Sequence, residues 1–269
     1  MQNERNLILP PPAAFRITGR GDCFTQKIFI IMITSGTTKP SNPPTGKFLK
    51  PEDVLTELPD LVEVEEWLPL SEHDRLYYRS AVSEGNFMGM RQAAMLGGKR
   101  SEKLQRLLEI VDEARDNERR VLVFSQFVQM LTLLEKECRV RNISTHLLTG
   151  QTKDRQEVVN AFQNDPNPGV FLLSLRAAGT GLNLTNASYV VLYDPWWNPA
   201  VEAQAIDRSH RIGQTQTVNA YRLIAPGTVE EKIWELQQSK AKTIADVLGE
   251  EGFARSLTKT ELEYLFSED

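Results

Sequence analysis

Apolar and polar positions alternate in regular blocks from about residue 119 to residue 249. Short apolar runs typical of buried strands cover residues 121–127, 144–150, 169–175, 188–194 and 217–225. Between them, apolar positions recur every three or four residues, which predicts helices over residues 128–139, 152–163, 199–212 and 228–249. Apolar strands that alternate with helices predict an α/β fold with a mostly parallel sheet flanked by helices on both faces.

The pattern is different upstream of this block. Residues 51–70 turn from helix-like to alternating, which indicates a short helix that enters an extended strand. Two amphipathic stretches, residues 71–82 and 101–116, predict an extra N-terminal helical segment, and Ser71 is suited to cap its first turn. Gly97 and Gly98 separate the two stretches.

Seven of the fourteen prolines lie within the first 51 residues, where little periodicity is present. Such a segment is typical of a poorly ordered arm or linker. We expect the chain to be divided into a Pro-rich arm, a linking strand with helices, an α/β lobe and a C-terminal tail helix, with the boundaries 1–50, 51–118, 119–249 and 250–269.

Composition narrows the class of protein. No run approaches the roughly 20 apolar residues that span a bilayer, so no membrane partner is expected. Two cysteines, neither in a CxxC pair, and three histidines provide no material for a disulfide framework or a protein-built metal site. We expect an intracellular protein, located in the cytoplasm or nucleoid of a prokaryote or the nucleus of a eukaryote. The net charge is −5, yet residues 139–222 hold eight Lys or Arg against six Asp or Glu.

Ligands of a parallel sheet bind at the carboxyl ends of its strands, which directs attention to the loops "RAAGTGLNLTNA" (176–187) and "PWWNPAVEAQ" (195–204). Gly179 and Gly181 would let backbone N–H groups approach a phosphate, but taken by themselves they favour a plain strand-to-helix turn. Of the adjacent indoles Trp196 and Trp197, either both pack inside or one is presented to a nucleic acid.

Three side chains of the predicted helix 199–212 share one face. Gln204, Arg208 and Arg211 are spaced by four and three residues, and two guanidinium groups with an amide suit a multiply charged anion such as a phosphate. The alternative is a surface helix whose arginines form ion pairs with Glu202 or Asp207.

Four segments in this order resemble the second RecA-like lobe of Swi/Snf-type DNA translocases, the helicase C-terminal domain. They read "VLVFSQF", "LLTGQTKDRQEVVNAFQ", "FLLSLRAAGTGLNLTNASYVVLYDPWWNP" and "QAIDRSHRIGQTQTV". The resemblance extends from about residue 50, through "EDVLTELPDLVEVEEWLPLSEHDRLYY", to "LTKTELEYLF" near the C-terminus. Two of the segments are long and chemically unusual, so the match is specific.

The resemblance implies roles for individual residues. Arg208 and Arg211 would reach the γ-phosphate of ATP, with Gln204 beside them and Arg211 as the arginine finger. Gly181 and Asn183 would lie near the nucleotide ribose. A further set would contact the DNA backbone without reading sequence, namely Trp197, Thr149, Gly150, Ser174, Gly179 and Thr180.

The family also requires a first lobe, which holds ATP with Mg²⁺. The sequence contains no GxxxxGK[ST] loop and no DExH or DExD group, and "LGGKRS" has Arg100 where a hydroxyl residue is needed. We therefore expect a truncated or split motor that hydrolyses ATP negligibly alone and needs double-stranded DNA and a first lobe in trans. The alternative is a non-catalytic DNA-binding or protein-interaction module left by truncation.

Overall fold

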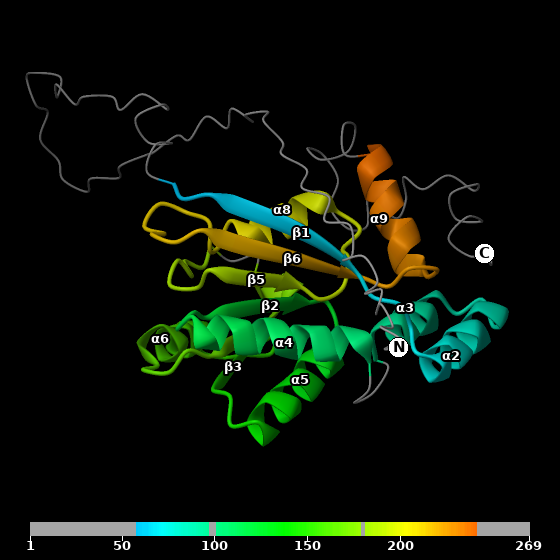
Figure 1. Ribbon diagram of the computed structural model, residues 1–269, viewed down its shortest axis with the longest axis horizontal. Helices are drawn as coiled ribbons and strands as arrows, with labels where there is room; N and C mark the ends of the chain where they lie inside the picture. The colour runs from blue at the N-terminus through cyan, green and yellow to red at the C-terminus, as the bar shows by residue number, and fades with distance from the viewer. Residues whose placement is uncertain (1–57, 97–100, 179–180, 241–269) are drawn as a thin grey trace, which may run out of the picture.

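The computed structural model describes residues 58–96, 101–178 and 181–240. In this part of the chain six strands form one parallel sheet with the order β1-β6-β5-β2-β4-β3 (Figure 1). The strands are β1 (Leu61–Trp67), β2 (Val121–Ser125), β3 (Thr145–Leu148), β4 (Val170–Ser174), β5 (Tyr189–Leu192) and β6 (Val218–Ile224). The predicted α/β class with a parallel sheet is confirmed.

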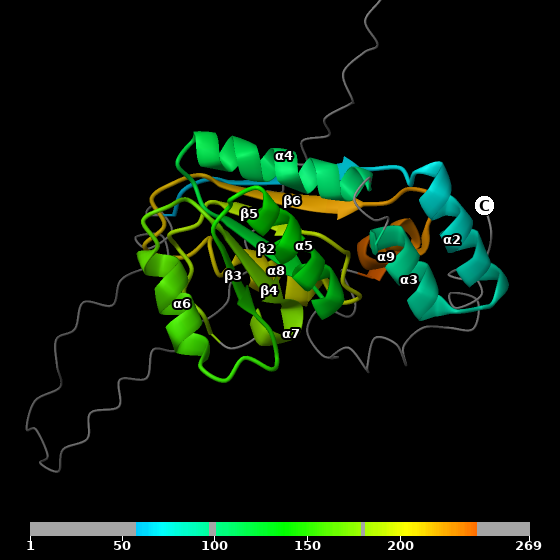
Figure 2. The ribbon, with the colours of Figure 1, turned by 90° about the horizontal axis from the view of Figure 1, so that it is seen from below.

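Helices cover both faces of this sheet, as Figure 2 shows for α4 on one side and α6 and α7 on the other. One apolar core joins the sheet to α4 (Glu102–Asp116) and α5 (Val128–Val140). The second core joins the opposite face to α6 (Arg155–Asn164), α7 (Leu175–Ala178) and α8 (Pro199–Ile206). The remaining helices are α2 (Glu72–Ser83), α3 (Phe87–Leu96) and α9 (Val229–Lys240).

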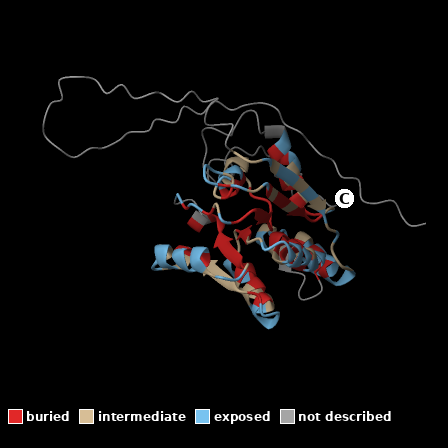
Figure 3. Cartoon of the chain, turned by 60° about the vertical axis from the view of Figure 1, so that its left-hand side comes forward, coloured by how far each residue is buried: buried red, intermediate tan, exposed pale blue. Residues whose placement is uncertain are grey.

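The three central strands are buried along their whole length, which Figure 3 shows as the buried middle of the molecule. Their sequences, VLVFS, VFLLS and YVVL, are continuous apolar runs because helices cover both faces. Of the three, β2 and β4 end on serines that face each other in register, Ser125 and Ser174. These serines mark the carboxyl edge of the sheet, from which the connections to α5 and α7 leave toward opposite faces.

The helical segment upstream of the lobe forms a third apolar cluster beyond the carboxyl ends of β1 and β6 (Figure 1). The predicted cap is present: the Oγ of Ser71 accepts a 3.2 Å hydrogen bond from the Asp74 amide. Gly85, with φ of 61°, reverses the chain after α2, so that α3 becomes a separate helix that packs against α2 and α9. The strand predicted near residue 65 is β1, and it pairs with β6.

The predicted Pro-rich arm and the C-terminal tail helix lie outside the described residues, as do Gly97 and Gly98. Within the described ranges, no helix has both the length and the apolar character needed to cross a bilayer.

Candidate functional site

The helix that carries the candidate arginines is shorter than the sequence pattern predicts. Asn198 caps α8 with its side chain, Pro199 starts it, and the helix ends at Ile206. Turns follow: the His210 amide bonds to the Ile206 carbonyl at 3.0 Å, and the Arg211 amide to that of Ser209 at 3.1 Å. The prediction of a helix through residue 212 is therefore wrong.

A tertiary hydrogen bond explains why the helix stops. The buried hydroxyl of Ser209 donates to the carbonyl oxygen of Ala187, and the Gln214 side chain donates to the same oxygen at 2.8 Å. These bonds hold residues 209–214 next to Ala187, which precedes β5, and so prevent the helix from continuing. Consequently Arg211 does not share a helical face with Gln204, and the one-face argument made from the sequence fails for this arginine.

The residues from Asp207 to Gly213, which we call the arginine turn, lie at the amino edge of the sheet. Helix α8 starts beside the carboxyl end of β5 and leads to the start of β6, so its last turn reaches the opposite edge. There the amide of Leu184 donates a 2.9 Å hydrogen bond to the carbonyl oxygen of Arg208. The glycine loop and the arginines, about 25 residues apart in sequence, are thereby joined.

The charges of the arginine turn favour an anion. Burial raises the pKa of the Asp207 carboxyl, and the neighbouring His210, Arg208 and Arg211 oppose that rise. Arg211 is exposed. The Nε of Arg208 is buried and has no hydrogen-bond partner among the described residues. A buried donor without a partner is the feature expected where an anion binds.

The ion-pair alternative from the sequence named two carboxylates, Glu202 and Asp207, and they have different partners. Glu202 does not pair with the arginines of the turn, because its carboxylate accepts a 2.9 Å hydrogen bond from the Nε of Arg222 on β6. Asp207, the other carboxylate considered, does interact electrostatically with Arg208 and Arg211.

The other nucleotide-site candidates are Gly181, Asn183 and Gln204. The first two precede Leu184, which bonds to the arginine turn, and Gln204 is on the helix that leads into it. Gly181 is exposed, with φ of 55° and open space where a side chain would stand. Asn183 is exposed, and its carbonyl oxygen accepts a 2.8 Å bond from the Gln163 side chain near the end of α6. Gln204 is exposed on the last turn of α8.

The DNA-contact candidates lie at the carboxyl edge instead. Thr149 and Gly150 follow β3; Thr149 is buried, its hydroxyl accepts from the Gln151 amide at 3.3 Å, and Gly150 is exposed. Ser174 is the last residue of β4 and is buried, with its Oγ accepting from the Ala177 amide at 3.3 Å. Gly179 and Thr180 lie outside the described residues. Among the described residues, Thr149 and Ser174 therefore lie at the edge opposite the arginine turn.

The adjacent indoles have different environments. Trp196 is buried in the core between the sheet and α8, and its amide donates a 2.7 Å bond to Glu202. Trp197 is half-buried against α3, with its ring centroid 5.1 Å from that of Phe87. Both indoles pack against the fold, and Trp197 keeps part of its surface exposed.

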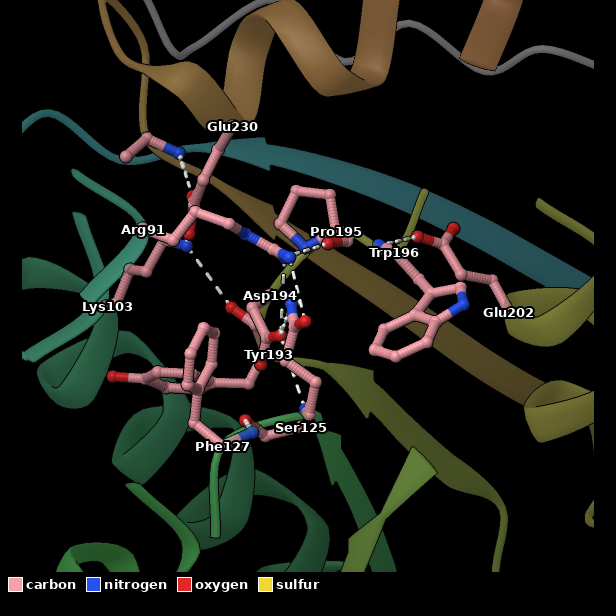
Figure 4. Close-up of polar contacts among 12 residues, drawn as sticks. Arg91, Lys103, Ser125, Phe127, Tyr193, Asp194, Pro195, Trp196, Glu202 and Glu230 are labelled. Carbon is pink, nitrogen blue, oxygen red and sulfur yellow. Dashed lines mark hydrogen bonds and ion pairs between the residues drawn. The ribbon is translucent and has the colours of Figure 1, made fainter. Parts of the chain in front are cut away.

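Figure 4 shows a network of buried charges around residues 193–196 that the sequence did not indicate. Lys103 of α4 donates to the Tyr193 carbonyl at 3.2 Å and pairs with Glu230 of α9. Burial raises the pKa of Glu230, and the Lys103 ammonium opposes that rise. Buried ions of this kind persist only when paired, so each pair fixes two elements against each other.

A second buried cation, Arg91 of α3, contacts the same loop after β5. Its guanidinium donates 2.7 Å hydrogen bonds to the Pro195 carbonyl and to Oε1 of Gln126, and lies 3.8 Å from Asp194. Gln126 in turn donates to the Asp194 carboxylate at 2.7 Å. The only sequence signal for Arg91 and Lys103 is a charge within an apolar helical stripe. Their loop partners, Pro195 and Tyr193, lie about 100 residues away in the sequence.

No group of three His, Cys, Asp or Glu side chains within the described ranges is placed to hold a metal ion.

Comparison with known proteins defines the class first. Residues 102–213 match the helicase conserved C-terminal domain. A putative ATP-dependent helicase/translocase of Bacillus subtilis, YwqA, is 34% identical over 249 residues, which cover 80% of this chain and 27% of that protein. The chain spans less than a third of the length of the curated relatives that it matches first.

Solved structures then show which type of helicase-like protein this chain resembles. The C-terminal domain of the Sulfolobus solfataricus SWI2/SNF2 ATPase is 25% identical, with a TM-score of 0.61, and the match covers 78% of this chain and all of that domain. The core of that ATPase in complex with dsDNA is 29% identical, with a TM-score of 0.65, over 81% of this chain and 52% of that one. The resemblance drawn from the motifs is confirmed: residues 102–213 match the helicase C-terminal domain, and the chain is similar in sequence and fold to the C-terminal domains of SWI2/SNF2 ATPases.

Proposed function

We propose that this chain is the nucleotide-sensing and DNA-gripping second lobe of an ATP-dependent double-stranded DNA translocase. In this proposal the amino edge, with the arginine turn, faces a nucleotide held by a first lobe. The carboxyl edge, with Trp197, lies against the DNA backbone. The Sulfolobus relative whose core was solved with dsDNA supports a duplex as the partner.

The observation that carries the proposal is the hydrogen bond from the Leu184 amide to the Arg208 carbonyl. It joins the loop of Gly181 and Asn183 to the arginines at one edge, although these residues leave from different strands. A surface helix with scattered ion pairs would have no reason to maintain this junction. Together with the unpartnered Nε of Arg208 and the exposed Arg211, it forms a cationic end suited to phosphate oxygens.

The two arginines act on the charge of the nucleotide. Bound ATP supplies the phosphoryl group to be transferred, and its Mg²⁺ is assigned to the first lobe. Arg211, as the exposed guanidinium, stabilises charge on the γ-phosphate, while Arg208, half-buried and fixed through its carbonyl, holds the turn and contributes a second cation. Gln204 is exposed on α8, the helix that leads into the turn.

The DNA contacts of the carboxyl edge are proposed to be independent of base sequence. Gly150 presents backbone without a side chain, Ser174 and Thr149 place hydroxyls at strand ends, and Trp197 offers a partly exposed indole. Such groups contact phosphate and sugar, and bases only by stacking. A lobe that carries only part of the interface binds weakly and with strong salt dependence.

The test combines this chain with a separately purified first lobe of the Bacillus subtilis relative and measures DNA-stimulated ATP hydrolysis. We expect negligible turnover by either piece alone and restored turnover by the mixture. Arg211→Ala should lower the restored rate by about 10³-fold, the usual contribution of an arginine finger. The control is Arg79→Ala, which removes an exposed arginine of α2.

Two outcomes would overturn the proposal. Substantial ATP hydrolysis by this chain alone would contradict the assignment of the nucleotide to a first lobe. Duplex binding that ignores both nucleotide and first lobe, without restored turnover, would instead identify a non-catalytic DNA-binding module.

A further inference from the structure

We infer that Arg91 and Phe87 of α3 are positioning residues for Trp197, so that the helical segment upstream of residues 102–213 sets the geometry of the DNA-contacting loop. The inference rests on the proposed function for its DNA part. Its geometric part, the orientation of the indole, can be tested without DNA.

The contacts of Trp197 come from α3. Phe87 packs on the indole at a centroid distance of 5.1 Å and an interplanar angle of 31°. The guanidinium carbon of Arg91 lies 5.6 Å from the centroid of the same indole and 5.4 Å from that of Phe127, which leads into α5. A planar cation near two aromatic rings restricts the rotation of both. Trp197 is thereby held on one side and exposed on the other.

Arg91 also fixes the backbone of the loop. Its bonds to Gln126 and to the Pro195 carbonyl connect the ends of β2 and β5, and Asp194 supplies the counter-charge at 3.8 Å. Arg91 is only 2% exposed, so no water replaces these bonds if they are lost. A lysine keeps the charge but cannot donate to two separated acceptors in one plane.

The two α3 residues of this arrangement lie outside the part of the chain that matches the helicase domain. Residues 102–213 contain Gln126, Asp194 and Trp197, whereas Arg91 and Phe87 precede that range. The upstream helices therefore do more than fill space beyond the sheet: they contribute the groups that orient an indole of the carboxyl edge.

The first experiment reads the indole directly. The full chain is labelled with fluorotryptophan, and the Trp197 fluorine resonance is assigned by its loss in Trp197→Phe. We expect Arg91→Lys and Phe87→Leu each to shift or broaden this resonance, while Arg79→Lys on the exposed face of α2 leaves it unchanged. An unshifted resonance in both α3 variants would overturn the inference. Phe87→Leu decides the question if Arg91→Lys does not fold.

The second experiment is a double-mutant cycle on duplex binding, measured by anisotropy of a labelled DNA at low salt. Trp197→Ala and Arg91→Lys should each weaken binding about fivefold, consistent with the loss of one stacking contact. Their combination should bind no more weakly than Trp197→Ala alone, because Arg91 acts through the indole.

The outcomes separate the two levels of the argument. Equal weakening by Arg91→Lys with and without Trp197 would show that Arg91 does not act through the indole, and would overturn the inference. No duplex binding by the wild-type chain would contradict the proposed function, while the fluorine spectra would still decide whether α3 positions Trp197.

Discussion

The amide of Leu184 donates a 2.9 Å hydrogen bond to the carbonyl oxygen of Arg208. Leu184 belongs to the connection from β4 to β5, and Arg208 to the connection from β5 to β6. The bond fixes the backbone at Arg208 while its side chain keeps a buried, unpartnered Nε. The turn is thus held by its main chain, and the side chain of Arg211 is exposed.

Gly213 lets the chain reverse after the arginine turn. Its φ of 101° is unfavourable for any L-residue, whereas a side chain there would make only an ordinary contact with Thr185 at 3.9 Å. Gly213→Ala should therefore lower the free energy of unfolding by about 1–2 kcal/mol through backbone strain alone. Urea denaturation measures this, and Gly150→Ala, which also has open space but no positive φ, should change it by less than about 0.5 kcal/mol. Equal losses for both would contradict the strain argument.

The pair of Lys103 and Glu230 connects α4 to α9 in the buried interior. Lys103→Met leaves the Glu230 carboxylate buried without its cation and should cost about 3–5 kcal/mol of the free energy of unfolding. Adding Glu230→Gln to Lys103→Met removes the uncompensated charge and should recover part of this loss. The exposed pair of Arg115 and Asp112, 3.5 Å apart, is the control, and Arg115→Gln should change stability by about 0.5 kcal/mol or less. A double variant less stable than Lys103→Met would refute the account.

Asp165 should make the stability of the fold dependent on acidic pH. A hydrogen bond from the Ser144 hydroxyl, with further ones from the Asn167 amide and from His146, lowers the pKa of this carboxyl from 3.8 to about 2. Because the folded pKa is below the unfolded one, the stabilisation is complete above about pH 4 and is lost as the pH falls toward 2.

Urea unfolding across that pH range checks the Asp165 prediction. Asp165→Asn should flatten the part of the profile between about pH 4 and pH 2, and Ser144→Ala should give an intermediate profile because it removes the strongest donor. Identical slopes in the wild-type chain and Asp165→Asn would show that this carboxyl does not contribute.

Cys138 should be chemically inert in the folded protein. The thiol lies in the core between α5 and the sheet, and burial raises its pKa from 9.0 to about 11. The thiolate is the reactive form, so a disulfide reagent should not modify Cys138 at neutral pH until the chain is unfolded by urea. Cys23→Ser leaves Cys138 as the single cysteine, and the colour released by the reagent measures its reaction. Rapid reaction without urea would contradict the prediction.

The sequence alone determined the alternation of strands and helices, the parallel sheet, the family and the cap at Ser71. These features depend on local patterns: a continuous apolar run such as VFLLS in β4 indicates a strand covered on both faces, wherever its neighbours lie. The proposal for the arginines also starts from the sequence, because residue type and motif order are properties of the chain itself.

Only the tertiary structure decided where helix α8 ends and which edge each candidate occupies. Helix α8 ends at Ile206, six residues before the predicted end. The bond from Ser209 to Ala187 that follows it joins residues 22 positions apart, so helical periodicity contains no trace of it. In the same way Arg91 meets Pro195 across 104 residues. Contacts of this kind depend on which segments the folded sheet brings together. Local sequence therefore does not show that the loop bearing Trp197 and the arginine turn lie at opposite edges of the sheet.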